Sequence, residues 1–214
     1  MNHDEHTILF TPEFWDERYR SAPAIWSGHP NSRLVEHATD LSPGTALDVG
    51  SGEGADAIWL ASRGWDVTGI DVSTVALDRA AERAAALGAE IADRITWRQA
   101  DVMTWDPAPQ QFDLVSAQFM HLPPEPLVAL HRRLAAAVRP GGSLLIVGHH
   151  PSDQHTSVGH PGREELLYTA EQVAAELAPQ DWTIVLAASP ERPATDPDGA
   201  PVTLRDAVLH AVRR

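Results

Sequence analysis

The chain is 214 residues long, 43% hydrophobic and 21% charged, values typical of one globular domain that buries its own core. It has no cysteine, which excludes disulfides, thiolate nucleophiles and cysteine-rich zinc sites. Because the formal net charge is −14 and no run of Lys or Arg offsets it, we expect a small-molecule partner and no nucleic acid.

No apolar stretch approaches the roughly 20 residues that cross a bilayer. Residues 1–6 are polar and acidic, unlike the apolar core of a secretory signal. We therefore expect a cytoplasmic protein with no membrane partner. The sequence leaves the oligomeric state open, and a homodimer is one of the alternatives.

In chain order, a segment with aromatic residues precedes an alternation of short β-branched runs with alanine-rich helical stretches. Residues 1–41 are expected to form a cap, and residues 42–214 one α/β domain with a doubly wound sheet. The pattern predicts N-caps at Ser73 and Thr169. Strands are expected at 45–50, 66–71, 95–100, 112–118, 143–149, 182–188 and 202–210, and helices at 54–63, 75–87, 125–138 and 170–177.

The end of this alternation departs from a regular parallel sheet. Residues 189–200 are rich in Pro and Asp, show no helical pattern and are expected to form a mobile loop. Because a parallel crossover usually needs a helix, the seventh strand is expected to be antiparallel.

A glycine-rich loop follows the first strand in the stretch Asp48-Val49-Gly50-Ser51-Gly52-Glu53-Gly54. Glycines at this place let the chain turn tightly and let a ligand approach the main chain. A dinucleotide-binding dehydrogenase could use Gly50, Gly52 and Ala55 in the same way. Against that alternative, Asp48 would repel a pyrophosphate, whereas it suits a cationic ligand without phosphate, such as S-adenosylmethionine.

Two further carboxylates end the next strands. Asp71 can accept hydrogen bonds from both hydroxyls of a ribose, with Val72 packing on the adenine, although Asp71 could instead cap the next helix. Asp101 lies at the carboxyl end of the third strand, where open α/β sheets bind ligands, and could accept the adenine amino group.

The ordered set formed by the glycine loop, Gly69 to Ser73, Ala100 to Val102 and Phe112 to Val115 resembles class I S-adenosylmethionine-dependent methyltransferases. Phe14 to Tyr19 and Trp26 to Asn31 resemble the N-terminal part of small bacterial enzymes of the tellurite-resistance and thiopurine type. The resemblance implies a Rossmann-like sheet of seven strands in the order 3-2-1-4-5-7-6.

The same resemblance implies a set of cofactor contacts. Gly50 and Gly52 would line the methionine moiety, Asp71 the ribose, and Asp101 with Val102 the adenine. Gln118, at the end of the fourth strand, would lie under the methionine moiety.

Three histidines are candidates for a general base, because a hydroxyl acceptor must lose a proton and imidazole titrates near neutral pH. His121 follows the fourth strand, and His149 and His150 end the fifth. Side chains alternate along a strand end, so only one of the adjacent pair is expected to face inward. His121 could equally be structural.

A divalent metal is a weaker alternative at this place. His149, His150, Asp153 and His155 could ligate a cation that orients a diol, but their spacing matches no fixed metal motif.

The cap supplies candidates for acceptor binding, although Trp15 and Trp26 could simply anchor it to the sheet. The acceptor-binding candidates are Trp15, Tyr19, Trp26, His29 and Asn31.

The sequence thus predicts a small-molecule O-methyltransferase with a histidine base. The stretch from His149 to Asp153 and the tail from Asp196 onward resemble actinobacterial methyltransferases that act on sugars, including the mannosides of methylmannose polysaccharide. A mannoside hydroxyl is therefore the first acceptor expected. Transfer to sulfur, selenium or tellurium, a nicotinamide-dependent oxidoreductase and a non-catalytic binding module remain alternatives.

Overall fold

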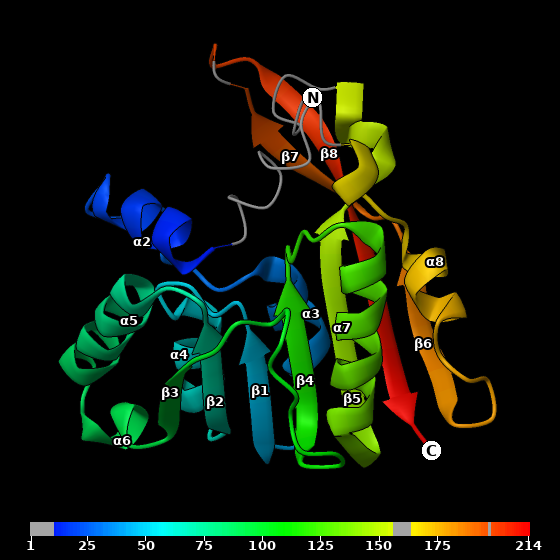
Figure 1. The fold of residues 1–214 in the computed structure, drawn as a ribbon, viewed down its shortest axis with the longest axis horizontal. Coiled ribbons are helices and arrows are strands. Elements are labelled where there is room, and N and C mark those ends of the chain that lie inside the picture. Colours follow the sequence, from blue (N-terminus) through cyan, green and yellow to red (C-terminus); the bar gives the residue numbers. More distant parts are fainter. Residues whose placement is uncertain (1–10, 156–163, 197) are drawn as a thin grey trace. The chain divides into compact units, whose positions relative to one another are not determined.

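The computed structural model describes residues 11–155, 164–196 and 198–214 (Figure 1). Their contacts divide the chain into two compact units. The N-terminal unit comprises residues up to Asp106 together with Phe112–Ser116, and the C-terminal unit comprises Pro107–Gln111 together with Ala117–Arg214. None of the helices in the described ranges combines the length and apolarity that a membrane span requires.

The N-terminal unit is a parallel βαβαβ arrangement preceded by two short helices. Strand β1 pairs with β2 and β2 with β3, both in parallel. Ser73 accepts from the amide of Ala76 and so caps α5, as predicted. The elements are α2 (Pro12–Arg20), α3 (Ser32–Ala38), β1 (Thr45–Val49), α4 (Ala55–Ser62), β2 (Asp66–Asp71), α5 (Thr74–Ala86), α6 (Ala89–Ala92) and β3 (Ile95–Gln99).

The C-terminal unit is built around a long last strand that pairs in antiparallel fashion with three others. Thr169 forms a capping box with Gln172 at the start of α8, again at the predicted position. The elements are α7 (Pro124–Ala137), β5 (Val138–His149), η1 (Pro151–His155), η2 (Glu164–Leu166), α8 (Ala170–Ala175), β6 (Trp182–Ala188), β7 (Glu191–Thr195) and β8 (Pro201–Arg213).

Strand β4 (Phe112–Gln118) has residues in both units and lies between β1 and β5 in the sheet. The strand order is β3-β2-β1-β4-β5-β8-β6, with β7 paired to β8. Since β8 is the seventh strand expected from the sequence, the predicted order and its antiparallel last strand are confirmed.

One expectation was wrong, because residues 191–195 form strand β7 rather than part of a loop. Pro193 argued against a strand at these residues, because proline cannot donate a ladder hydrogen bond and is found mainly in edge strands such as this one. Asp196 then closes the hairpin by accepting from the amides of Asp198 and Ala200. Strand β8 begins at Pro201, one residue before the expected start at 202, and continues to Arg213, past the expected end at 210.

Candidate functional site

The loop after β1 turns tightly, as its glycines predicted, and it does so through left-handed backbone. Gly50, Gly52 and Gly54 have φ angles of 70°, 52° and 82°, a region that side chains with a Cβ rarely occupy. The side chain of Trp97 on β3 packs closely against Gly54 of the loop and Gly69 of β2. A Cβ on Gly54 or Gly69 would lie 2.7 Å or 2.6 Å from its ring, so the loop and β2 require glycine there.

Asp71 organises the same loop from the end of β2. Its Oδ2 accepts from the amide of Gly52 at 2.9 Å, and its Oδ1 accepts from the amide of Ser73 at 2.9 Å. Asp71 therefore ties the glycine loop to the start of α5. Capping of α5 falls to Ser73, so Asp71 is not the cap of that helix.

Three carboxylates lie close together in the N-terminal unit. Asp48 is 2% exposed, and its Oδ2 has no hydrogen-bond partner among the described residues. Burial raises its pKa well above the usual range, and the charges of Asp56 and Asp71 add to the effect. Burial also raises the pKa of Asp56 to about 6, opposed by the hydrogen bond from the amide of Asn31, and it raises the pKa of Asp71.

This electrostatic arrangement selects among ligands. Buried carboxylates that repel one another favour a cation beside them and oppose a phosphate. A sulfonium and an ammonium fit this demand, and a pyrophosphate does not. The orphaned Oδ2 of Asp48 and the open glycine turn thus fit S-adenosylmethionine better than a dinucleotide.

The third predicted contact region follows β3. Asp101 accepts from the amide of Met103 through Oδ1 at 2.8 Å, and Val102 is buried. In the C-terminal unit, Gln118 ends β4 and is half-buried. Val72 follows Asp71 directly and is half-buried as well. The roles given to these four residues remain predictions.

The cap packs on the glycine loop. Tyr19 is 3% exposed, and a Cβ on Gly52 would lie 3.0 Å from its hydroxyl. That hydroxyl accepts from the indole of Trp26 at 3.1 Å. Glu53, buried in the loop, accepts from the amides of Ile25 and Trp26 and pairs with Arg79 at 3.0 Å. Residues that follow α2 are therefore held on the loop by Glu53, which the sequence did not single out.

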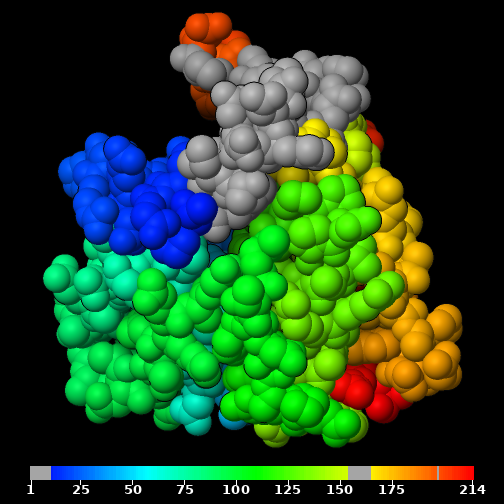
Figure 2. Space-filling view, in the orientation of Figure 1, coloured from blue at the N-terminus to red at the C-terminus, as the bar shows by residue number. Residues whose placement is uncertain are grey.

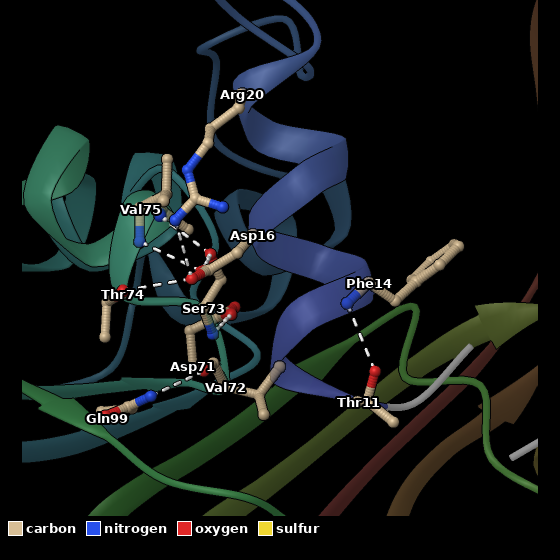
Figure 3. A network of polar contacts seen from close by, with 11 residues as sticks. Thr11, Phe14, Asp16, Arg20, Asp71, Val72, Ser73, Thr74, Val75 and Gln99 are labelled. Atoms are coloured by element: carbon tan, nitrogen blue, oxygen red, sulfur yellow. Dashed lines mark hydrogen bonds and ion pairs between the residues drawn. The ribbon is translucent and has the colours of Figure 1, made fainter. Parts of the chain in front are cut away.

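Asp16 attaches helix α2 to the start of α5 (Figure 3). Its Oδ1 accepts from the Ser73 hydroxyl at 2.6 Å and from the Val75 amide at 3.3 Å, while Oδ2 faces Thr74 and Arg20. Burial pushes the pKa of Asp16 upward, but these hydrogen bonds and the charge of Arg20 together hold it below the ordinary value. The atoms of α2 and α5 lie against each other in the space-filling view (Figure 2).

The other acceptor-binding candidates of the cap are distributed differently. Trp15 packs beside Tyr19 at 6.1 Å between ring centroids, and the guanidinium of Arg18 lies 5.9 Å from its ring. His29 is exposed. Asn31 caps α3 by accepting from the Arg33 amide at 2.8 Å. Contact of these side chains with an acceptor remains a prediction.

In the C-terminal unit, two of the predicted bases form a stack. The rings of His121 and His149 are 4.9 Å apart and inclined by 8°. Phe119 lies 4.6 Å from His149 and completes the group. Its φ of 54° is unusual for a residue with a Cβ, and its amide donates to the Val147 carbonyl at 2.7 Å. The bend after β4 thus brings three rings from two strand ends together.

His150 lies outside this stack and is turned toward η1. Its Nδ1 accepts from the amide of Ser152 at 3.1 Å and lies 2.9 Å from the hydroxyl of the same residue. Because a backbone amide can only donate, the neutral ring carries its proton on Nε2. Nδ1 of His150 is thus occupied by a local contact within the turn.

The possible metal ligands do not form a cluster in the described part of the chain. No group of three His, Asp or Glu side chains that could hold a metal is found there. Both oxygens of Asp153 accept from the amide of Arg205, at 3.0 Å and 2.9 Å, which attaches η1 to β8. The side chain of His155 lies outside the described residues.

An ion pair that the sequence did not indicate lies next to the stacked rings. Arg192 on β7 donates through Nε to Asp206 on β8 at 2.7 Å, and its guanidinium lies 5.8 Å from the ring centre of Phe119. Asp206 is the register partner of His149, so both side chains lie on one face of the sheet. No sequence signal links Arg192 to His149, because only the unexpected hairpin brings them together.

Comparison with known proteins places these features in a wider group. Residues 46–142 match a family model described as a methyltransferase domain. Methyltransferase GfsG of Streptomyces halstedii is 34% identical over 137 residues, which cover 62% of this chain and 48% of that protein. A probable thiol methyltransferase of Arabidopsis thaliana is 27% identical, covering 61% of this chain and 59% of that protein.

The fold is shared with solved structures. A chain from a study of disulfide-to-thioacetal conversion in echinomycin biosynthesis superposes with a TM-score of 0.73 at 23% identity, covering 95% of this chain and 92% of that one.

The chain spans between about half and two thirds of the length of the first curated relatives it matches, 48%, 59% and 66%.

Proposed function

Because the chain belongs to the class I S-adenosylmethionine-dependent methyltransferases, we propose that it transfers a methyl group to a hydroxyl of a small molecule. A sugar hydroxyl, first that of a mannoside, is the acceptor proposed. The observation that carries the cofactor half of this proposal is the buried, unpartnered Oδ2 of Asp48 beside a glycine loop with left-handed backbone.

The N-terminal unit supplies the residues that would hold the cofactor. Asp71 would take the ribose hydroxyls, and Asp101 with Val102 the adenine. Asp48 would compensate positive charge, and Tyr19 would exclude water from the loop that it covers. When bound, S-adenosylmethionine supplies an electrophilic methyl carbon on sulfur, and the sulfur keeps the bonding electron pair as the methyl leaves.

His149 is the base we propose. The acceptor hydroxyl would give its proton to His149 while its oxygen forms the new bond to carbon, so that charge and atoms balance. Stacking on His121 and contact with Phe119 fix the imidazole, which favours a defined direction of proton transfer. His150 is less suited, because Nδ1 is engaged by Ser152. His121 would then position His149.

The alternative acceptor atom is sulfur. Its support comes from the relatives named as thiol and thiocyanate methyltransferases. A thiol is acidic enough to react without a strong base, so transfer to sulfur would not depend on a histidine. The two functions therefore differ in their need for His149.

Replacement of single histidines separates these alternatives. With an alcohol acceptor such as a methyl mannoside, His149→Ala should lower kcat by about 10²-fold or more, the usual contribution of a general base. His150→Ala is the matched control and should stay within about 3-fold of the parent, since it leaves the stack intact. Equal turnover by the parent and His149→Ala, or turnover of thiols but of no alcohol, would reject the hydroxyl proposal.

A further inference from the structure

The ion pair of Arg192 and Asp206 joins a buried carboxylate to a partly exposed guanidinium. Asp206 is 1% exposed, whereas the Arg192 side chain is 29% exposed. The carboxylate therefore lies inside the unit and the guanidinium reaches its surface. Since a buried, hydrogen-bonded carboxylate moves little, it fixes the direction of the arginine side chain.

The Arg192 guanidinium is held by a hydrogen bond from Nε and by a ring contact on one face, whereas its two terminal nitrogens face no partner among the described residues. Nε is used by Asp206, and one face lies over Phe119. Within the described part of the chain, neither terminal nitrogen of Arg192 has a hydrogen-bond partner. A guanidinium held in this way presents a planar pair of donors, which matches the two oxygens of a carboxylate.

The location of this pair connects it to the proposed chemistry. Phe119 contacts both the Arg192 guanidinium and the ring of His149. His149 and Asp206 are direct register partners on β5 and β8. The open donors and the proposed base are thus parts of one cluster, formed by Phe119, His121, His149, Arg192 and Asp206 and here called the arginine–histidine cluster.

Charge decides which anion this cluster prefers. Asp206 already neutralises Arg192, and the whole chain has a net charge of −14. A multiply charged phosphate would be repelled by this field, whereas a single carboxylate gains two directed hydrogen bonds at less electrostatic cost.

On these grounds we propose that Arg192 is a specificity-determining residue, which binds a carboxylate of the methyl acceptor. The inference rests on the proposed function, because it names the class of acceptor used at the same cluster. The natural acceptor then carries a carboxylate as well as the hydroxyl that is methylated. An acidic sugar would be preferred to the neutral mannoside named first, and a phosphorylated compound would be disfavoured.

The test is calorimetric titration of matched acceptor pairs into the full chain saturated with S-adenosylhomocysteine. The pairs are methyl glucuronide with methyl glucoside, and 4-hydroxybenzoate with 4-hydroxybenzamide. At least one acid should bind 10-fold or more tightly than its neutral partner. Arg192→Gln should abolish that preference, and Arg205→Gln should leave it intact, because Arg205 belongs to the same hairpin but pairs with the exposed Glu191.

Arg192→Gln also leaves Asp206 without its cation, which could unfold the hairpin. The double variant Arg192→Gln/Asp206→Asn removes both charges together and should fold with a melting temperature close to that of the parent. It should lack the preference for acids as well.

The inference is overturned if no acid in the set binds, if each neutral partner binds as tightly as its acid, or if the folded double variant keeps the preference. Failure of the proposed function is distinguishable, because it would appear first as a lack of S-adenosylhomocysteine binding by the parent.

Discussion

Asp48 in β1 and Asp71 at the end of β2 are buried, and Asp56 in the first turn of α4 is half-buried. None of the three carboxylates takes part in an ion pair within the described residues, so no cation there offsets the cost of their desolvation. Raised pKa values follow directly from this arrangement. A ligand that carries positive charge would offset the desolvation cost of these three carboxylates. The same carboxylates make the stability of the unliganded chain depend on pH.

Asp56 gives the clearest pH dependence. Its pKa is about 6 in the folded chain and 3.8 as the ordinary value, so the folded state binds more protons between these limits. Its stabilising contribution, about 3 kcal/mol, is therefore complete below about pH 4 and is lost as the pH rises through about 6.

Asp56→Asn should remove this dependence while keeping an oxygen for the Asn31 amide. The measurement is urea unfolding of the parent and the variant without cofactor at several pH values from 4.5 to 7. The free energy of unfolding of the parent should fall relative to that of the variant. Parallel pH profiles of the two proteins would contradict the assignment.

The sequence predicted the roles of some residues discussed above and not of others. Asp48, Gly52 and Asp71 stand in one ordered pattern at strand ends, so their neighbourhood could be predicted. Asp56 and Arg192 could not, because each acquires its role from a partner distant in the chain. The amide of Asn31 binds Asp56, and Asp206 binds Arg192.

At the scale of elements, helix α2 depends on one side chain for its attachment to α5. Asp16→Ala removes the contacts to Ser73 and Val75 and should loosen Tyr19 from Gly52, one turn further along. We expect the affinity for S-adenosylhomocysteine to fall about 5-fold or more, corresponding to the loss of a charge-assisted hydrogen bond.

Glu13→Ala is the control for this prediction, since Glu13 is an exposed carboxylate on the same helix. Calorimetric titration of both variants gives the comparison. If Asp16→Ala binds as tightly as Glu13→Ala, the cap does not contribute to cofactor binding.

The end of β5 depends on a close contact on its other face. Gly148 precedes His149, and a Cβ there would collide with the ring of Tyr168, with Cε1 only 2.9 Å away. Tyr168 is buried against His131, which pairs with Glu176 at 3.1 Å. Burial raises the pKa of the Tyr168 phenol, so the ring stays neutral in this packing.

Gly148→Ala should lower the free energy of unfolding by about 1–3 kcal/mol through overpacking. In a Tyr168→Ala background the same substitution should cost little, because the colliding ring is gone. Thermal unfolding of the four proteins in this cycle provides the measurement. An equal cost of Gly148→Ala in both backgrounds would show that the contact is not the cause.

At the scale of the whole molecule, the alternation of short apolar runs with helical stretches predicted β1 to β6, and it was clearest for β1, β2, β4 and β5, whose residues are mostly buried. Strand β7 escaped prediction, because it is short, lies at an edge and contains Pro193. Strand β7 carries Arg192, the residue on which the proposed specificity for an acidic acceptor depends.

The prediction of the site followed the same division. The glycine-rich loop between β1 and α4 is local in sequence, and its position was predicted. The arginine–histidine cluster joins residues from 119 to 206, and only the pairing of β5 with β8 and of β8 with β7 brings them together. Long-range pairing of this kind leaves no periodic signal in the sequence.

The most direct test of the account is calorimetric titration of the full chain with S-adenosylhomocysteine and, in parallel, with NADH. We predict one-site binding of S-adenosylhomocysteine, loss of that binding in Asp71→Ala, and no binding of NADH. Binding of NADH without binding of S-adenosylhomocysteine would contradict the account, because the buried carboxylates around Asp48 would then be accommodating a pyrophosphate.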